Sequence, residues 1–203
     1  MLPRFVLAST SPRRQQLLAE AGLEFETIAA GGVPERASRF LTIRELTTGN
    51  AARKAMAVAR RQPEAVVLGA DTLVALDGAL IGKPANLEEA FRILQRLSGH
   101  EHVVCTGVFI CSVARKKMIN FQVVSQVRFR SLREAEIRAY LAKIDPLDKA
   151  GAYAAQGDGT DIIACIRGSY TNVVGLPMGE TLCALRHFGI QPGRKKPQKF
   201  SRP

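Results

Sequence analysis

Residues 5–14 have the sequence Phe5-Val6-Leu7-Ala8-Ser9-Thr10-Ser11-Pro12-Arg13-Arg14. An apolar run typical of a β-strand is followed by three hydroxyl residues, a proline and two arginines. Ser11 is a suitable N-cap, and Pro12 suits the first helical position, where its missing N–H costs nothing. The stretch therefore predicts a strand over 4–8 that leads into a helix over 12–21, as in an α/β domain.

The two arginines fall in the first turn of the expected helix, where the helix dipole already places partial positive charge. Cations are favoured there if an anion sits among them, because the free N–H groups, the dipole and the guanidinium groups would all contact a phosphate. The alternative is a capped surface helix with two solvated arginines. Both interpretations remain open from Arg13 and Arg14 alone.

The chain has 203 residues, of which 46% are hydrophobic and 23% are charged, an ordinary globular balance. This length suits one sizeable α/β domain or two small ones. No apolar run approaches the roughly 20 residues that span a bilayer, and the N-terminus lacks the pattern of a signal peptide. We therefore expect a soluble, cytoplasmic protein with no membrane partner.

The formal net charge is +11, and the segment 194–203 carries five basic and no acidic residues. A basic surface attracts polyanions, but no nucleic-acid-binding motif is present, so no dedicated nucleic-acid site is expected. The four cysteines have no metal or redox spacing, and their apolar neighbours predict buried, reduced thiols. Further strands are expected over 25–28, 65–76, 102–112, 118–129 and 162–166, and further helices over 42–60, 86–97, 131–144 and 177–188. Thr42–Glu45 and Ser131–Glu134 have the pattern of a capping box, and Asn86 is expected to cap the helix that follows it.

An unbroken apolar run from Ala65 to Ala70 is typical of a strand that is covered on both faces, and it ends in Asp71-Thr72. A carboxylate at the carboxyl end of a buried strand lies where α/β sheets place ligands. Asp71 could instead be a turn or cap residue, but the apolar pattern resumes at once at Leu73. Asp77-Gly78 then predicts a hairpin turn.

Polar residues at the ends of apolar elements include several cations and two carboxylates, a combination that suits a polyphosphate held with Mg²⁺. A carboxylate there can also orient or deprotonate a water molecule. The chain has no G-x-x-x-x-G-K-[ST], so it is not a P-loop protein. The collected residues are Ser9, Ser11, Arg13, Arg14, Glu35, Lys54, Asp71, Lys83 and Gln156.

Several short motifs occur along the chain between residues 9 and 177: Ser9–Arg14, Gly69–Thr72, Lys83-Pro84, Thr106–Val108, Asp148–Tyr153, Gln156-Gly157 and Gly168–Pro177. In their order, these motifs resemble the Maf family of nucleotide pyrophosphatases. The resemblance implies an α/β fold with a mixed twisted sheet flanked by helices, similar to the inosine triphosphate pyrophosphatases. It implies hydrolysis of a nucleoside triphosphate to the monophosphate and pyrophosphate with a divalent metal such as Mg²⁺ or Mn²⁺, and a homodimer. The domain would cover 1–190, and 191–203 would be a basic, disordered tail.

The resemblance also implies a role for individual residues. Asp71 matches the catalytic base, and Asp71 with Glu35 would bind the metal. The match at Glu35 is loose, because the family usually has an acidic pair where this chain has Glu35-Arg36. Asp145-Pro146 replaces the family's usual Glu-Pro. The substrate would be bound by Ser9, Ser11, Arg13, Arg14, Lys54 and Lys83, and the specificity positions would be Arg13, Thr72 and Gln156.

The family has one branch that acts on dTTP and UTP and another that acts on 7-methyl-GTP, which tends to carry a glutamate where Gln156 stands. A neutral amide, with donor and acceptor, matches the N3–H and carbonyl edge of thymine or uracil, whereas a carboxylate suits the cationic 7-methylguanine. The first branch is therefore expected. The alternatives are a 7-methyl-GTP pyrophosphatase, or a non-catalytic regulator of cell division that binds nucleotide or nucleic acid.

Overall fold

The computed structural model describes residues 3–34, 38 and 40–193 of the chain. Within these residues a seven-stranded mixed sheet has the strand order β2-β1-β3-β5-β6-β7, with β4 paired to β3. The pairs β1–β2 and β1–β3 are parallel, and the others are antiparallel. The strands are β1 (Phe5–Leu7), β2 (Glu26–Thr27), β3 (Val66–Leu76), β4 (Ala79–Ile81), β5 (Glu101–Ser112), β6 (Lys117–Phe129) and β7 (Ile163–Arg167).

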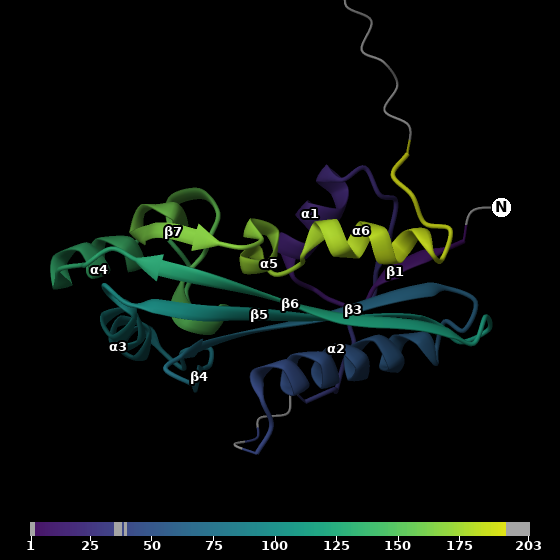
Figure 1. Cartoon of the computed structure of the whole chain (residues 1–203), viewed down its shortest axis with the longest axis horizontal. Helices are drawn as coiled ribbons and strands as arrows, with labels where there is room; N and C mark the ends of the chain where they lie inside the picture. The colour runs from purple at the N-terminus through teal and green to yellow at the C-terminus, as the bar shows by residue number, and fades with distance from the viewer. Residues whose placement is uncertain (1–2, 35–37, 39, 194–203) are drawn as a thin grey trace, which may run out of the picture.

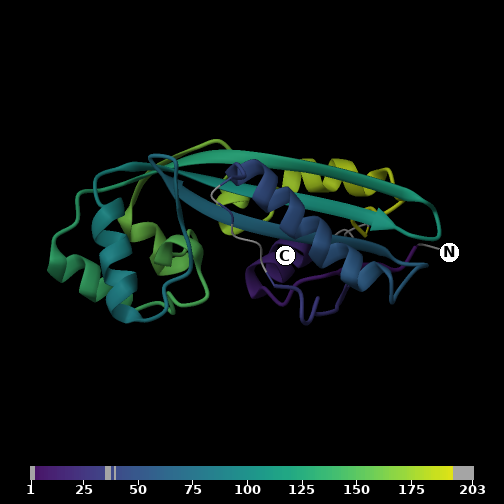
Figure 2. The same cartoon turned by 90° about the horizontal axis from the view of Figure 1, so that it is seen from below.

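Helices cover both faces of this sheet, which confirms the expected α/β fold with a mixed twisted sheet (Figure 1). Figure 2 shows α2 running along one face of the long strands, with α3 and α4 together at one end of the molecule. The helices are α1 (Pro12–Glu20), α2 (Ile43–Ala59), α3 (Leu87–Leu97), α4 (Glu134–Leu141), α5 (Tyr170–Val174) and α6 (Met178–Arg186), with 3-10 turns η1 (Ala150–Ala152) and η2 (Gly157–Ile162).

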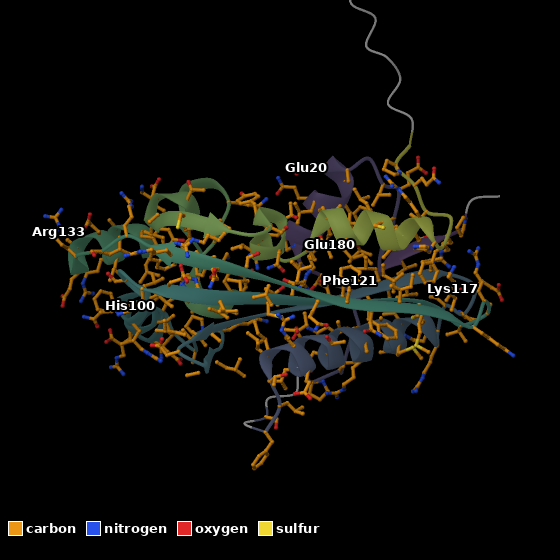
Figure 3. The ribbon with its side chains drawn as sticks, viewed as in Figure 1. Glu20, His100, Lys117, Phe121, Arg133 and Glu180 are labelled. Carbon is orange, nitrogen blue, oxygen red and sulfur yellow. The ribbon has the colours of Figure 1, made fainter. Side chains whose placement is uncertain are left out.

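Three apolar clusters make up the core of the described residues. The first joins β1, α1 and α6 on one face of the sheet, and the second lies under α2 on the other face. The third joins α3, α4 and the 152–153 segment at the end of the molecule that carries Arg133, opposite the β5–β6 hairpin tip near Lys117 (Figure 3). The first and second clusters therefore cover the two faces of the sheet, so that the sheet lies between layers of helices.

Two glycines allow α2 to lie unusually close to the sheet. A Cβ at Gly69 would stand 2.4 Å from the carbonyl oxygen of Ala51, and one at Gly107 would stand 2.5 Å from the backbone carbon of Thr47. Real Cβ atoms essentially never come so near to backbone, so both positions exclude any other residue at this packing distance. The close approach brings the polar residues of α2 within reach of β3.

Most expected elements are present, and the capping box predicted at Thr42 and Glu45 is confirmed. The prediction that a helix is capped at Ser131 and runs to Ile144 is wrong. Instead the carboxylate of Glu136 accepts the backbone N–H of Arg133 at 2.8 Å, so α4 begins at Glu134 and ends at Leu141. The short helix α5 was not anticipated.

Two further expectations are corrected by the structure. The strand expected over 65–76 is present as β3, but Asp71 lies inside it and not at its carboxyl end, because residues 67–75 pair without a break with β5. Cys105 and Cys111 are buried as expected, whereas Cys165 and Cys183 are exposed. Among the described residues, no helix combines the length and the apolar character that a membrane crossing requires.

Candidate active site

A cavity of about 440 Å³ opens beside the middle of β3, between the cluster that includes β1 and the cluster that includes α3. On this edge of β3, β1 pairs up to Leu68 and β4 pairs from Val74 on, and the cavity lies beside the residues between them. Asp71 and Thr72 are neighbours in a strand, so their side chains point to opposite faces of the sheet. The cavity borders both, because it wraps around this edge.

Asp71 is buried in the wall of this cavity, with 3% of its surface exposed. The ammonium of Lys54 donates to its Oδ1 at 2.7 Å, and the amide of Asn50 donates to its Oδ2 at 3.1 Å. Asn50 and Lys54 stand one turn apart on α2, so they share a face of the helix. Both carboxylate oxygens are therefore held. Because Asp71 also lies inside β3, it is neither a turn nor a cap residue.

Arg14 donates hydrogen bonds to at least three protein oxygens. Its Nε donates to the carbonyl of Gly175 at 2.8 Å, its Nη1 to the hydroxyl of Ser9 at 3.2 Å, and its Nη2 to the hydroxyl of Thr72 at 3.0 Å. A guanidinium held at three points has a defined plane. The alternative of a solvated surface arginine is therefore wrong for Arg14, which lines the cavity.

Arg13, which precedes Arg14 in the first turn of α1, forms an ion pair with Asp148, and both residues line the cavity. Its Nη1 donates to Oδ2 of Asp148 at 3.2 Å, and the ammonium of Lys149 donates to Oδ1 of the same carboxylate. Burial acts to raise the pKa of Asp148, but the hydrogen bond from Lys149 and the charges of Arg13 and Lys149 outweigh it and lower that pKa. These contacts connect α1 to the 148–155 segment across the site.

The start of α1 is capped differently from the sequence prediction. Ser11 takes the N-cap position, but within the described residues its hydroxyl accepts no capping hydrogen bond. Its own N–H donates instead to the hydroxyl of Ser9 at 3.2 Å. The first-turn N–H groups beyond Pro12 are thus left for another acceptor, as at a phosphate-binding helix N-terminus.

Charge in the cavity is strongly positive. Among the described residues that line it, five cations accompany two carboxylates. Lys83, in the loop after β4, is exposed and makes no ion pair with the described part of the chain. This excess of cations around a held carboxylate can bind a polyphosphate and present a carboxylate to it. The cations are Arg13, Arg14, Lys54, Lys83 and Lys149, and the carboxylates are Asp71 and Asp148.

Not every predicted site residue reaches the cavity. The structure brings together Ser9, Ser11, Arg13, Arg14, Lys54, Asp71, Thr72 and Lys83. Gln156 follows Ala155, which lines the cavity, but Gln156 is not itself among the described residues of the lining. Glu35 lies outside the described residues.

Sequence reasoning missed three residues of the site as functional candidates. Asn50 carried one usable signal, since it precedes Lys54 by four positions in a predicted helix. Asp148 and Lys149 belong to a motif that resembles the Maf family, but they were not predicted as site residues. Nothing in their local sequence places them opposite α1.

The chain was compared with protein families and curated proteins. The family model described as "Maf-like protein" matches residues 4–188. A dTTP/UTP pyrophosphatase of Pelotomaculum thermopropionicum is 46% identical over 188 residues, covering 93% of this chain and 98% of the relative. A dTTP/UTP pyrophosphatase of Akkermansia muciniphila is 44% identical over 191 residues, covering 94% and 100%. One of Bacillus cereus is 42% identical over 189 residues, covering 93% and 92%.

Proposed function

The chain belongs to the Maf family, and on this premise we propose that it is a nucleoside triphosphate pyrophosphatase that hydrolyses dTTP and UTP. The products are the nucleoside monophosphate and pyrophosphate. The observation that carries the proposal is the Asp71 carboxylate, held by Lys54 and Asn50 inside a cavity rich in cations. Such a site offers a base next to a place for the triphosphate.

In the proposed reaction, Asp71 acts as the base and the cations of the cavity stabilise the leaving group. Each oxygen of Asp71 accepts one N–H and keeps a second lone-pair direction, through which it can take a proton from an attacking water. The water oxygen bonds to the α-phosphorus, and the bond from that phosphorus to the α–β bridging oxygen breaks. Arg13, Lys83 and Lys149 neutralise the charge that develops on the leaving pyrophosphate.

A divalent metal fits this donor set. The described residues contain no group of three or more His, Cys, Asp or Glu side chains that could hold an ion alone. Mg²⁺, however, needs only one or two carboxylates when substrate phosphates and waters complete its shell. Asp71 would hold it, together with Glu35 as the resemblance to the Maf family implies, and the bound ion would neutralise phosphate oxygens.

Arg13→Ala and Lys83→Ala are each expected to lower kcat/KM for dTTP by about 10- to 100-fold. Each removes one charge-assisted contact to phosphate, worth roughly 1.5–3 kcal/mol. Steady-state kinetics with a pyrophosphate-release assay measures the effect. Arg92→Ala is the matched control, because Arg92 lies exposed on α3 and pairs with Glu88. If Arg13→Ala and Lys83→Ala kept the kcat/KM of the control, neither residue would bind phosphate.

The proposed substrate class is tested by comparing kcat/KM for dTTP, UTP and 7-methyl-GTP, with pyrophosphate as the measured product. We expect the two pyrimidine nucleotides to be favoured at least about tenfold, or about 1.4 kcal/mol. Gln156→Glu should narrow this gap, since a carboxylate suits a cationic base, whereas Gln126→Glu on the exposed side of β6 should not. A wild-type preference for 7-methyl-GTP would reject the substrate assignment, and no pyrophosphate release at all would favour the non-catalytic alternative.

A further inference from the structure

A chain of hydrogen bonds runs from the cavity along one face of the sheet, from β3 to β5 and on to α5. Arg14 Nη2 donates to Thr72 Oγ1 on β3 at 3.0 Å. Thr72 Oγ1 lies 2.9 Å from Thr106 Oγ1, its register partner on β5. Thr106 Oγ1 donates to the carbonyl of Asn172 on α5 at 3.0 Å. The guanidinium at the cavity is thus connected by hydrogen bonds to a helix on the face of the sheet.

The protons in this chain can be placed in one consistent direction. A threonine hydroxyl has one proton to donate. Because Thr106 donates to Asn172, it accepts from Thr72, and Thr72 then receives the N–H of Arg14. The carbonyl of Gly175 is a longer contact for Thr72, at 3.4 Å, and already accepts Nε of Arg14 at 2.8 Å. The direction therefore runs away from the positive charge, toward the carbonyl of Asn172.

The far end of the chain is rigidly held. Asn172 is fully buried, and its amide donates to the carbonyl of Val104 at 3.1 Å and to the hydroxyl of Ser125 at 2.9 Å. These bonds tie α5 to β5 and β6. Thr106 is also fully buried and does not line the cavity, so it meets no substrate itself. A buried hydroxyl that lost a partner would be costly, so the arrangement has little freedom.

We propose that Thr106 is a positioning residue for triphosphate cleavage, which sets the plane of the Arg14 guanidinium through Thr72. The proposal rests on the proposed function and extends it. A guanidinium recognises phosphate oxygens through its planar set of donors, so its tilt decides how well it matches the charge that develops in the reaction. Thr72, a specificity position by family resemblance, then acts through Arg14, because its hydroxyl is committed to this chain.

Thr106→Val, Thr106→Ser and Thr181→Val form the test series. Thr106→Val keeps the shape and removes the hydroxyl, whereas Thr106→Ser keeps the hydroxyl. Thr181 is a matched control: it is fully buried on α6, and its hydroxyl has no hydrogen-bond partner among the described residues. We expect Thr106→Val to lower kcat for dTTP at least about tenfold with a smaller change in KM. The kcat of Thr106→Ser should lie within about threefold of the wild-type value, and the kcat of Thr181→Val should equal it.

A double-mutant cycle with Arg14→Lys separates positioning from a general loss of packing. If Thr106 acts through Arg14, Arg14→Lys should lower kcat by a large factor in the wild-type background. In the Thr106→Val background, the same substitution should lower kcat by no more than about threefold. Additive losses, or a wild-type kcat in Thr106→Val, would overturn the proposal. Should Thr106→Val fail to fold, Thr72→Val breaks the same chain nearer the cavity and must give the same coupling.

Binding of inorganic pyrophosphate, measured by calorimetry, keeps this inference distinct from the proposed function. It needs no hydrolysis, so it tests the Arg14 position even if the wild type cleaves no triphosphate, a result that would reject the function alone. Thr106→Val should bind pyrophosphate at least about threefold more weakly than Thr106→Ser and Thr181→Val. Equal affinities in the three variants would overturn the positioning role.

Discussion

Asp71→Asn is expected to lower kcat for dTTP by at least about 10³-fold while the protein stays folded. The asparagine has nearly the volume of the aspartate, but it cannot accept the proton of an attacking water. It also removes the negative charge that faces Lys54, whose ammonium lies 2.7 Å from Oδ1. A single-turnover assay of pyrophosphate release measures the loss, and circular dichroism during heating checks the fold.

Two further variants serve as controls for Asp71→Asn. Asp161→Asn is the matched control, because Asp161 forms an exposed ion pair with Lys143 away from the cavity lining and should keep wild-type activity. Asp71→Glu restores the charge beside Lys54 but displaces the carboxylate by one methylene group. It should fold like wild type and remain strongly impaired. More than a few per cent of residual activity in pure, folded Asp71→Asn would remove Asp71 from the role of base.

Gly107→Ala is expected to lower the free energy of unfolding by about 3 kcal/mol and to lower activity with it. The new methyl group would meet three backbone atoms of α2 at 2.5 to 2.7 Å, namely the carbon and oxygen of Thr47 and the nitrogen of Thr48. No flexible side chain can give way there, so the helix itself must move. Because Gly107 is the register partner of Asp71, this movement draws Asn50 and Lys54 away from the carboxylate.

The same helix offers the matched control. Gly49 is exposed on α2, and a Cβ there would meet nothing within 4 Å. Gly49→Ala should therefore raise the free energy of unfolding by about 0.5–1 kcal/mol, since alanine favours a helix interior over glycine. Urea denaturation of both variants measures the two effects. A stability of Gly107→Ala equal to that of wild type would mean that α2 does not lie as close to β5 as described.

The sequence by itself determined the features that depend on neighbours a few positions apart. The apolar run after Ala65, the hairpin turn at Asp77-Gly78 and the capping residues Thr42 and Asn86 each act within about four residues, and the structure has all of them. It also supplied the chemical types that a phosphate site requires, because cations and a carboxylate stand at the ends of apolar elements. Eight of the nominated positions accordingly line one cavity.

Only the tertiary structure decided which groups meet. The contacts of Asn50 with Asp71, of Arg13 with Asp148 and of Arg14 with Gly175 span 21, 135 and 161 residues. Which residues come into contact depends on the strand order and on how closely the helices pack on the sheet. No local sequence pattern determines the strand order or the packing distance. Pairing with β5 likewise placed Asp71 in the middle of β3 and not at a strand end, because the ladder of backbone hydrogen bonds continues past the point where the apolar pattern is interrupted.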